Sequence, residues 1–343
     1  MDFLRRILGR PDNSTAVGPS NDGIQITQDS AEPARPPEPV IEPPVNGAVA
    51  ANEAAPTVVA DVPPPKKVEM AGTRPLPPIE PMVPGPGQRL HFGQLSDVGM
   101  ARTNNQDAVL SIVASSSSND DLPDFGLFVV ADGMGGHHDG EKASALATRI
   151  VSEHVIEQIF MAMLTQRMND PDRPTITDVL REAVQHANDI VSDRVPDGGT
   201  TVTSAVILGD LAYVVHVGDS RAYLVTPEGI EQLTRDHSLV QRLIELDQLT
   251  PEEAAEHPQR NVLYRALGQS ENLDVDAITR RLGPHARLLL CSDGLWNLVT
   301  EETIRTVVQE CLDPQEACKR LVDLANERGG PDNVTVILVQ VPG

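Results

Sequence analysis

Three acidic turns in the sequence each carry an aspartate beside a glycine or an asparagine. They are VADGMGG (130–136), LLCSDG (289–294) and GGPDNV (329–334). Asp132 and Asp293 follow apolar runs typical of strands, and Asp332 stands just before another such run. One Asp-Gly pair alone is most often an ordinary turn. Three together favour a second interpretation, in which carboxylate and carbonyl oxygens gather around a hard cation, Mg²⁺ or Mn²⁺.

Two further segments offer different chemistry. Arg102 lies five residues before Asp107 in SDVGMARTNNQDA (96–108). An arginine fork can hold two oxygens of a phosphate dianion, although a lone arginine is more often a solvated surface charge. The run HVGDSR (216–221) places Asp219 in a turn between two strand-like stretches and, taken alone, is a hairpin.

The residues around these turns predict strands and helices that alternate in groups. Apolar runs typical of strands fall at 127–131, 201–208, 211–217, 221–226, 287–291 and 334–341. Helical periodicity falls at 141–165, 175–195, 301–311 and 314–328. Thr300 is a good N-cap for the third helix. Because tight turns join much of the strand sequence, we expect an α+β fold with antiparallel sheets and the helices outside.

Charge and composition exclude several classes of protein. The 343 residues carry a formal net charge of −23, of which −19 falls on residues 89–343. Such a domain repels polyphosphate, so we expect no nucleic-acid partner. No stretch approaches the roughly 20 apolar residues that span a bilayer. The three cysteines are odd in number and lack a C-x-x-C spacing, which favours a reducing cytoplasm.

The first 88 residues differ from the rest of the chain. They hold 18 of the 29 prolines, and we expect residues 11–88 to be a proline-rich disordered linker. Residues 1–10 place Phe3, Leu4, Ile7 and Leu8 opposite three arginines, the pattern of a short amphipathic basic helix. That segment could dock weakly on an anionic membrane or an acidic partner, or be an unstructured start. We expect one folded domain over residues 89–343.

The ordered motifs together resemble the metal-dependent protein phosphatases of the PPM (PP2C-like) family, in its bacterial form. The resemblance covers about residues 89–341. Besides the five runs above, it includes GGTTVTSAV (198–206), LTRDHSLV (233–240) and NVLYRALG (261–268). It implies a PP2C-like sandwich of two central antiparallel β-sheets flanked by helix pairs, with a metal centre between the sheets. It also implies hydrolysis of phosphoserine and phosphothreonine by a metal-activated water.

The family resemblance assigns a role to individual residues. It implies that Asp132 bridges two core Mn²⁺ or Mg²⁺ ions, that the Gly133 carbonyl binds one, and that Asp293 and Asp332 bind the other. Asp219, with Asp293, would hold a third ion. Arg102 would hold the substrate phosphate, and Asp107 would act through water.

This sequence departs from the family pattern in two places. Many eukaryotic relatives have a histidine directly after the Asp-Gly pair, where this chain has Met134. His137, three residues later, is the candidate general acid, although a surface histidine beside the metal loop fits equally well. Gln106 stands where many relatives have glutamate. Residues 238–262 would form the flap beside the active site.

Three functions remain open from the sequence. The first is an active phosphatase for phosphorylated proteins, whose partners would be bacterial-type Ser/Thr kinases and their substrates. The second is an inactive relative that binds phosphoproteins, which the joint presence of Arg102, Asp132, Asp293 and Asp332 argues against. The third is a phosphatase dedicated to one regulatory partner, which the motifs do not separate from the first.

Overall fold

A computed structural model describes residues 89–116, 122–135 and 138–341. The segments predicted as a docking element (1–10) and a linker (11–88), and the candidate acid His137, lie outside the described residues. The strands are β1 (His91–Asp97), β2 (Asp107–Ala114), β3 (Phe125–Gly135), β4 (Gly198–Thr200), β5 (Val202–Leu208), β6 (Leu211–Val217), β7 (Arg221–Val225), β8 (Ile230–Gln232), β9 (Asp276–Arg281), β10 (Arg287–Cys291) and β11 (Val334–Gln340).

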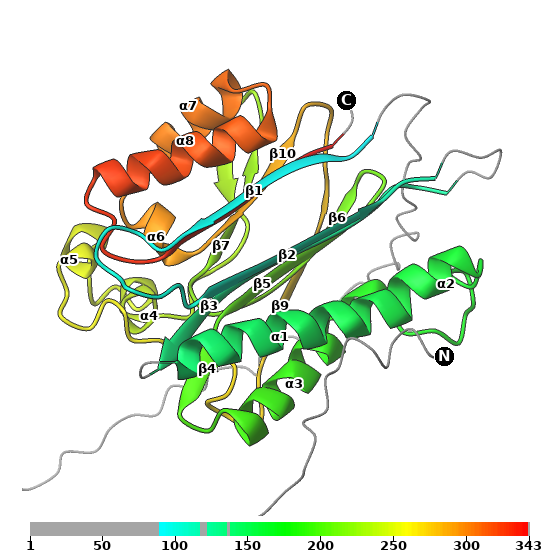
Figure 1. Cartoon of the computed structure of the whole chain (residues 1–343), viewed down its shortest axis with the longest axis horizontal. Helices are drawn as coiled ribbons and strands as arrows, with labels where there is room; N and C mark the ends of the chain where they lie inside the picture. The colour runs from blue at the N-terminus through cyan, green and yellow to red at the C-terminus, as the bar shows by residue number, and fades with distance from the viewer. Residues whose placement is uncertain (1–88, 117–121, 136–137, 342–343) are drawn as a thin grey trace, which may run out of the picture. The chain divides into compact units, whose positions relative to one another are not determined.

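The strands form two antiparallel sheets. One has the order β1-β11-β10-β7-β8, and the other has the order β2-β3-β5-β6-β9, with β4 paired to β3. Figure 1 shows the sheets lying face to face, with helices outside each of them. The predicted sandwich of two antiparallel sheets flanked by helices is therefore confirmed.

Alternating side chains of the central strands fill two different layers. In β3, Phe128 and Val130 point into the core between the sheets, while Leu127 and Val129 point under the helices. Successive side chains of a strand face opposite sides of the sheet, so a strand covered on both faces is apolar throughout. This is why the sequence shows these strands as continuous apolar runs rather than as alternating ones.

The helices that the structure describes are α1 (Asp139–Val155), η2 (Ile156–Phe160), α2 (Met161–Leu164), α3 (Ile176–Arg194), α4 (Leu239–Glu245), α5 (Pro251–Ala255), α6 (Asp293–Trp296), α7 (Glu301–Glu310) and α8 (Pro314–Glu327). The longest of them cover the outer faces of the sheets. Helices α1 and α3 share a core with β3 and β5, and α7 and α8 share one with β10 and β11. The Thr300 side chain accepts a hydrogen bond from Thr303 N, which confirms the predicted N-cap.

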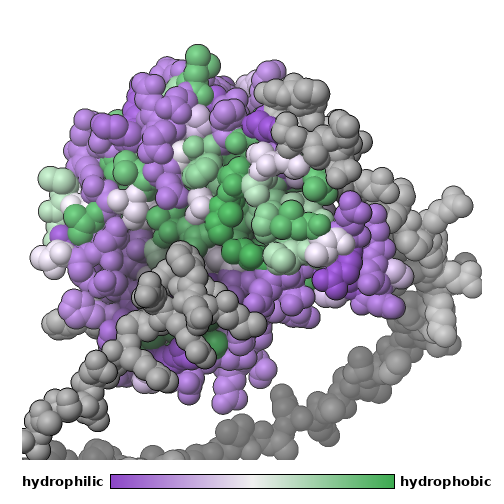
Figure 2. Space-filling model, turned by 45° about the vertical axis from the view of Figure 1, so that its right-hand side comes forward, coloured by the Kyte–Doolittle hydropathy of each residue, from purple (hydrophilic) through white to green (hydrophobic). Residues whose placement is uncertain are grey.

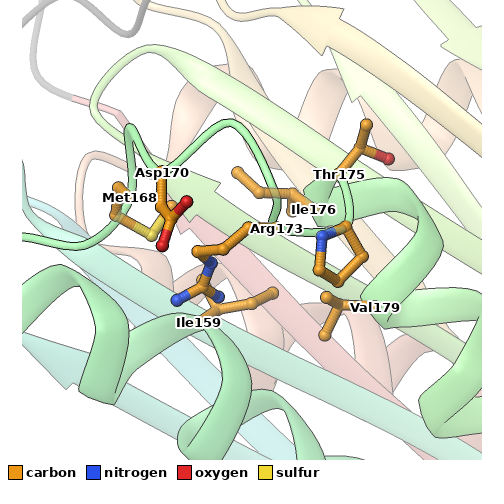
Figure 3. Close-up of a pocket in the computed structure, with 8 residues that line it drawn as sticks. Ile159, Met168, Asp170, Arg173, Thr175, Ile176 and Val179 are labelled. Atoms are coloured by element: carbon orange, nitrogen blue, oxygen red, sulfur yellow. The ribbon is translucent and has the colours of Figure 1, made fainter.

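The first predicted helix, 141–165, is interrupted by a turn of π-helix. Its residues divide among α1, η2 and α2. In a π-helix each backbone hydrogen bond spans one more residue than in an α-helix. The Arg173 side chain donates a hydrogen bond to the carbonyl of Gln158 within this turn. Beside this contact, Ile159, Met168 and Asp170 line a pocket of about 240 Å³ (Figure 3). The pocket lies at the end of the helix opposite to Asp132.

The surface combines hydrophilic and hydrophobic residues. Figure 2 shows a face on which hydrophilic residues surround a central group of hydrophobic ones. Among the described residues, no helix is long and apolar enough to cross a membrane.

Candidate active site

Two carboxylates face each other across neighbouring strands. Asp107 begins β2, and the strand register places it directly opposite Asp132 in β3. Like charges directly opposite in a sheet are destabilising. Asp132 affects the pKa of both Asp107 and Asp293, which places the three carboxyl groups in one cluster. Without a cation among them, such a cluster costs stability.

The backbone of Asp132 is held in place by two threonines. Thr201 Oγ1 accepts from Asp132 N at 2.9 Å, and Thr201 N donates to Asp132 O at 2.9 Å. Thr200 Oγ1 donates to the same carbonyl at 2.9 Å. The sequence places Asp132 at the end of its strand, but β3 continues to Gly135 by pairing with β4. This extra pairing gives the metal loop a fixed backbone.

Glycine is required beside Asp132 because another backbone segment passes very close. A Cβ added to Gly133 would lie 2.1 Å from Gly140 O in the first turn of α1. Gly133 N also donates to the carbonyl of Gln106 at 3.1 Å. The first turn of α1 is therefore packed directly against the predicted metal loop.

The second sheet brings the remaining carboxylates to the same place. Asp293 begins α6 directly after β10, and Asp332 lies just before β11, the neighbouring strand. Asn297 Nδ2 donates to Asp293 Oδ2 at 3.1 Å. A Cβ on Gly294 would lie 2.0 Å from Asn333 O, so glycine lets the two loops touch.

Electrostatics show how strongly these carboxylates affect one another. Burial is the main cause that raises the pKa of Asp107 to about 6 and that of Asp219 to about 7. Burial, followed by the negative charge of neighbouring aspartates, raises the pKa of Asp132 and of Asp293 well above the usual range. Each residue keeps some exposed surface, but its carboxyl group is enclosed by protein atoms.

The donor set fits a hard divalent cation. Asp107 Oδ1 and Asp293 Oδ1 are buried and accept no hydrogen bond within the described part of the chain. A buried carboxylate oxygen without a partner is costly. Carboxylate and carbonyl oxygens are the ligands that Mg²⁺ and Mn²⁺ prefer. These two oxygens are therefore the strongest structural sign of cation sites.

Asp107 itself is oriented by two hydroxyl groups. Ser292 Oγ donates to Asp107 Oδ2 at 2.8 Å, and Thr335 Oγ1 donates to the same oxygen at 2.6 Å. Oδ1 is thereby turned toward the other carboxylates. Sequence reasoning missed both hydroxyls, although Ser292 directly precedes Asp293.

Asn333 is a third residue that sequence reasoning missed. Its side chain accepts from Gln106 N at 2.8 Å and donates to Val98 O and Asn104 O at 2.9 and 3.0 Å. It thus fixes the loop that carries Arg102 and Asp107. The sequence could have indicated Asn333 only through its position next to Asp332 in the GGPDNV run.

Arg102 lies at the edge of the carboxylate cluster. Arg102 Nη2 donates to Asp332 Oδ2 at 2.8 Å, and the arginine side chain is 48% exposed. A guanidinium has five N–H donors, so one carboxylate does not exhaust it. The structure therefore brings the predicted phosphate ligand next to a predicted metal ligand, with a face open to solvent.

The turn that carries Asp219 is anchored from two sides. Trp296 Nε1 donates to Asp219 O at 3.0 Å, and Gly218 N donates to His237 Nδ1 at 3.0 Å. Gly218 has a φ of +113°, a conformation that glycine adopts without strain. His237 therefore holds the backbone of the turn that carries Asp219.

A second histidine in this region makes a prediction about acid stability. His216 is fully buried, its Nε2 donates to Arg235 O at 3.0 Å, and burial lowers its pKa to about 3. An unfolded chain takes up a proton near pH 6.5 that the folded chain cannot. The contribution of His216 to the unfolding free energy is therefore fully present above pH 6.5, and it is lost as the pH falls toward 3.

We expect the wild-type chain to lose about 2 kcal/mol more unfolding free energy than His216→Gln between pH 7 and pH 5. Chemical denaturation at several pH values measures this difference, with His285→Gln as the control. A wild-type-to-variant difference that stays constant with pH would contradict a buried neutral His216.

Comparisons with known proteins identify the family of this chain. Residues 100–326 match the family model for protein phosphatase 2C. Protein phosphatase PhpP of Streptococcus pneumoniae is 36% identical over 255 residues, which cover 74% of this chain and 98% of that protein. Serine/threonine protein phosphatase PstP of Mycobacterium tuberculosis is 36% identical over 258 residues, 74% of this chain and 45% of that protein.

Solved structures show the same fold. A serine/threonine phosphatase of S. agalactiae matches with a TM-score of 0.64 and 33% identity, over 74% of this chain and 99% of that one. The catalytic domain of PstP in complex with two manganese ions matches with a TM-score of 0.59 and 33% identity, over 74% and 99%. With the carboxylate cluster described above, this chain belongs to the protein phosphatase 2C family of metal-dependent protein serine/threonine phosphatases.

Proposed function

We propose that Asp132, Gly133, Asp293 and Asp332 hold two Mn²⁺ or Mg²⁺ ions. The observation that supports this most is the enclosed carboxylate cluster with two buried, unpartnered oxygens, Asp107 Oδ1 and Asp293 Oδ1. When bound, such ions acidify water and offset the negative charge of a phosphate. The Gly133 carbonyl is a suitable ligand because Gly133 itself carries no side chain.

The other residues act on the substrate and on the attacking water. Arg102 donates hydrogen bonds to the phosphate oxygens. These hydrogen bonds become stronger as negative charge builds up on the oxygens in the transition state. Asp107, held by Ser292 and Thr335, accepts a hydrogen bond from the water through Oδ1 and aligns it with phosphorus. His137 donates a proton to the leaving serine or threonine oxygen.

A cysteine nucleophile does not fit this site. Cys291 is fully buried in β10, and burial raises the pKa of its thiol to about 12. A thiol with such a pKa is not a thiolate at neutral pH. Cys291 is therefore not the nucleophile, and we propose that the phosphate is transferred directly to water.

Removing the Arg102 side chain is expected to weaken phosphate binding. We expect Arg102→Ala to raise KM for a small phosphate ester about tenfold or more, since a hydrogen bond to a charged group contributes about 1.5–3 kcal/mol. Mn²⁺ affinity, measured by calorimetry, stays at the wild-type value or rises, because Arg102 cannot ligate a cation. Arg320→Ala, an exposed arginine on α8, is the control. An unchanged KM would remove Arg102 from the phosphate site.

We propose further that Asp219, with Asp293, holds a third ion. The charge of Asp219 is the first neighbouring charge that raises the pKa of Asp293, after burial. We expect Asp219→Ala to keep two tightly bound ions but to lower kcat at saturating Mn²⁺ about tenfold. Calorimetric stoichiometry and kcat are measured together, with Asp323→Ala as the control. Wild-type kcat would leave Asp219 as a turn residue only.

The physiological substrates we propose are Ser/Thr kinases of bacterial type and the proteins that they phosphorylate. The relatives that match over nearly their full length are bacterial serine/threonine phosphatases. An inactive phosphoprotein-binding relative is disfavoured because Arg102, Asp132, Asp293 and Asp332 converge on one place. We place its action in the cytoplasm, where the three free cysteines stay reduced.

A further inference from the structure

Asn326 connects the loop that carries Arg102 with the loop that carries Asp332. It lies in the last turn of α8, and this helix packs on β1 and β11 (Figure 1). These two strands are neighbours in one sheet, and each borders one of the loops. Residues 98–106, which follow β1, are called the arginine loop, and residues 328–333, which precede β11, are called the aspartate loop.

The side-chain amide of Asn326 holds the beginning of the arginine loop. Asn326 Nδ2 donates to Asp97 Oδ1 at 3.0 Å, and Gly99 N donates to the same oxygen at 2.8 Å. Asp97 is the last residue of β1. This one carboxylate oxygen therefore ties the first turn of the arginine loop to the end of α8.

The first turn of the arginine loop rests directly on the aspartate loop. Met100 N and Ala101 N both donate to Gly330 O, at 2.7 and 3.2 Å. A Cβ added to Gly99 would lie 2.2 Å from Asp332 O, so the two backbones are in close contact. The proposed phosphate ligand is the next residue of the chain after these anchored positions. Any shift of the turn is therefore passed on to the arginine.

The same asparagine supports the aspartate loop from below. Asn326 O accepts from Gly329 N at 3.0 Å, and a Cβ added to Gly330 would lie 2.6 Å from Asn326 Oδ1. This Oδ1 is buried and accepts no hydrogen bond from the residues that the structure describes. A buried amide oxygen without a partner lowers stability. The stability of the fold alone therefore does not account for an asparagine at this position.

We propose that Asn326 is a positioning residue that, through Asp97, sets the place of Arg102 relative to Asp332. It would thereby fix the phosphate site relative to the metal centre. This inference rests on the proposed role of Arg102 as the phosphate ligand. A misplacement of about 1 Å can cost an enzyme about 10²-fold in rate, so a hydrogen bond that holds such a loop affects the reaction without touching the substrate.

The test combines Asn326→Ala with Arg102→Ala in a double-mutant cycle. Alanine removes the N–H donor that holds Asp97, together with the unpartnered oxygen. Full-length protein with saturating Mn²⁺ is assayed on a small phosphate ester as wild type, as each single variant and as the double variant. The inhibition constant of inorganic phosphate is measured on the same four proteins. Asn169→Ala, an exposed asparagine between α2 and α3, is the matched control.

We expect Asn326→Ala to raise KM and the inhibition constant of phosphate about three- to tenfold, which is less than the effect of Arg102→Ala. In the Arg102→Ala background the same substitution should change both constants less than about 1.5-fold, because no guanidinium remains to be positioned. Asn326→Asp keeps the size of the side chain but turns a second carboxylate toward Asp97. It should raise both constants further, since like charges repel.

Wild-type constants in both Asn326 variants would overturn the proposal. An equal change with and without Arg102 would overturn it as well, because Asn326 would then act through the metal centre or through overall stability. The Asn169→Ala control should keep wild-type constants throughout.

Hydrogen exchange separates a failure of this proposal from a failure of the proposed role of Arg102. If Arg102→Ala leaves KM unchanged, that role is wrong, and the amides of residues 98–101 still report on Asn326. Exchange at least about threefold faster in Asn326→Ala than in Asn169→Ala supports the anchoring of the arginine loop. Exchange at the wild-type rate would overturn it.

Discussion

Replacing Asp132 by asparagine is expected to lower kcat by at least about 10²–10³-fold and, at the same time, to stabilise the metal-free protein. Asp132 affects the pKa of both Asp107 and Asp293, and we propose that its loss removes a ligand of the metal centre. Without metal, the same carboxylate is buried among like charges, which raise its pKa. Asparagine keeps the size of the side chain and removes the charge.

The opposite signs of these two effects make the test specific. An ordinary damaging substitution lowers activity and stability together. We would measure kcat with saturating Mn²⁺ and the melting temperature in chelator, with the exposed Asp189→Asn of α3 as the control. Asp132→Asn that keeps activity within tenfold, or that melts below the wild type in chelator, would contradict the assigned role.

Divalent cations are expected to stabilise the protein strongly, and more so at higher pH. Folded-state pKa values of about 6 for Asp107 and about 7 for Asp219 lie above the usual value for aspartate. The stability that these groups contribute is therefore full below about pH 4 and is lost as the pH rises through 6–7. Repulsion between the carboxylates therefore lowers the unfolding free energy of the metal-free protein most near pH 8. A bound cation offsets this repulsion.

We expect Mn²⁺ at about 100 times its Kd to add about 3 kcal/mol to the unfolding free energy at pH 8, and clearly less at pH 5.5, where protons compete. Denaturation with Mn²⁺ and with chelator at each pH gives this increment, and the effect of His216 cancels in the difference. Magnesium should act in the same direction. An increment that is independent of pH, or that survives in Asp132→Asn, would place the stabilising ion elsewhere.

The central strands could be predicted from the sequence, and the edges of the sheets could not. Strands β5, β6, β7, β10 and β11 fall within one or two residues of their predicted ranges, because both faces of these strands are covered and most of their residues are apolar. Of the five strands that were missed, β1 and β8 are the edges of one sheet, β2 and β9 are the edges of the other, and β4 is a short strand paired to the end of β3. An edge strand is partly exposed, and its residues mix polar and apolar types, as in DAITRR of β9.

The acidic residues of the site could also be found from the sequence, but their supports could not. Each predicted aspartate stands in a turn with a glycine or asparagine, and this local signal survives without a structure. Ser292 and Thr335 hold Asp107 only because β10 and β11 are neighbours, which brings residues 43 positions apart into contact. No spacing along the chain predicts such a pair. The roles of His137 and of residues 1–88 stay predictions.

The measurement that tests the account most directly is a metal titration of phosphopeptide hydrolysis. Full-length protein is stripped with chelator, dialysed into metal-free buffer, and assayed on a phosphothreonine peptide as Mn²⁺ or Mg²⁺ is added. The enclosed carboxylate cluster predicts no hydrolysis in the stripped protein, and recovery as two ions bind per chain by calorimetry. Hydrolysis that persists in excess chelator after complete stripping would contradict a metal-dependent phosphatase built on Asp132, Asp293 and Asp332.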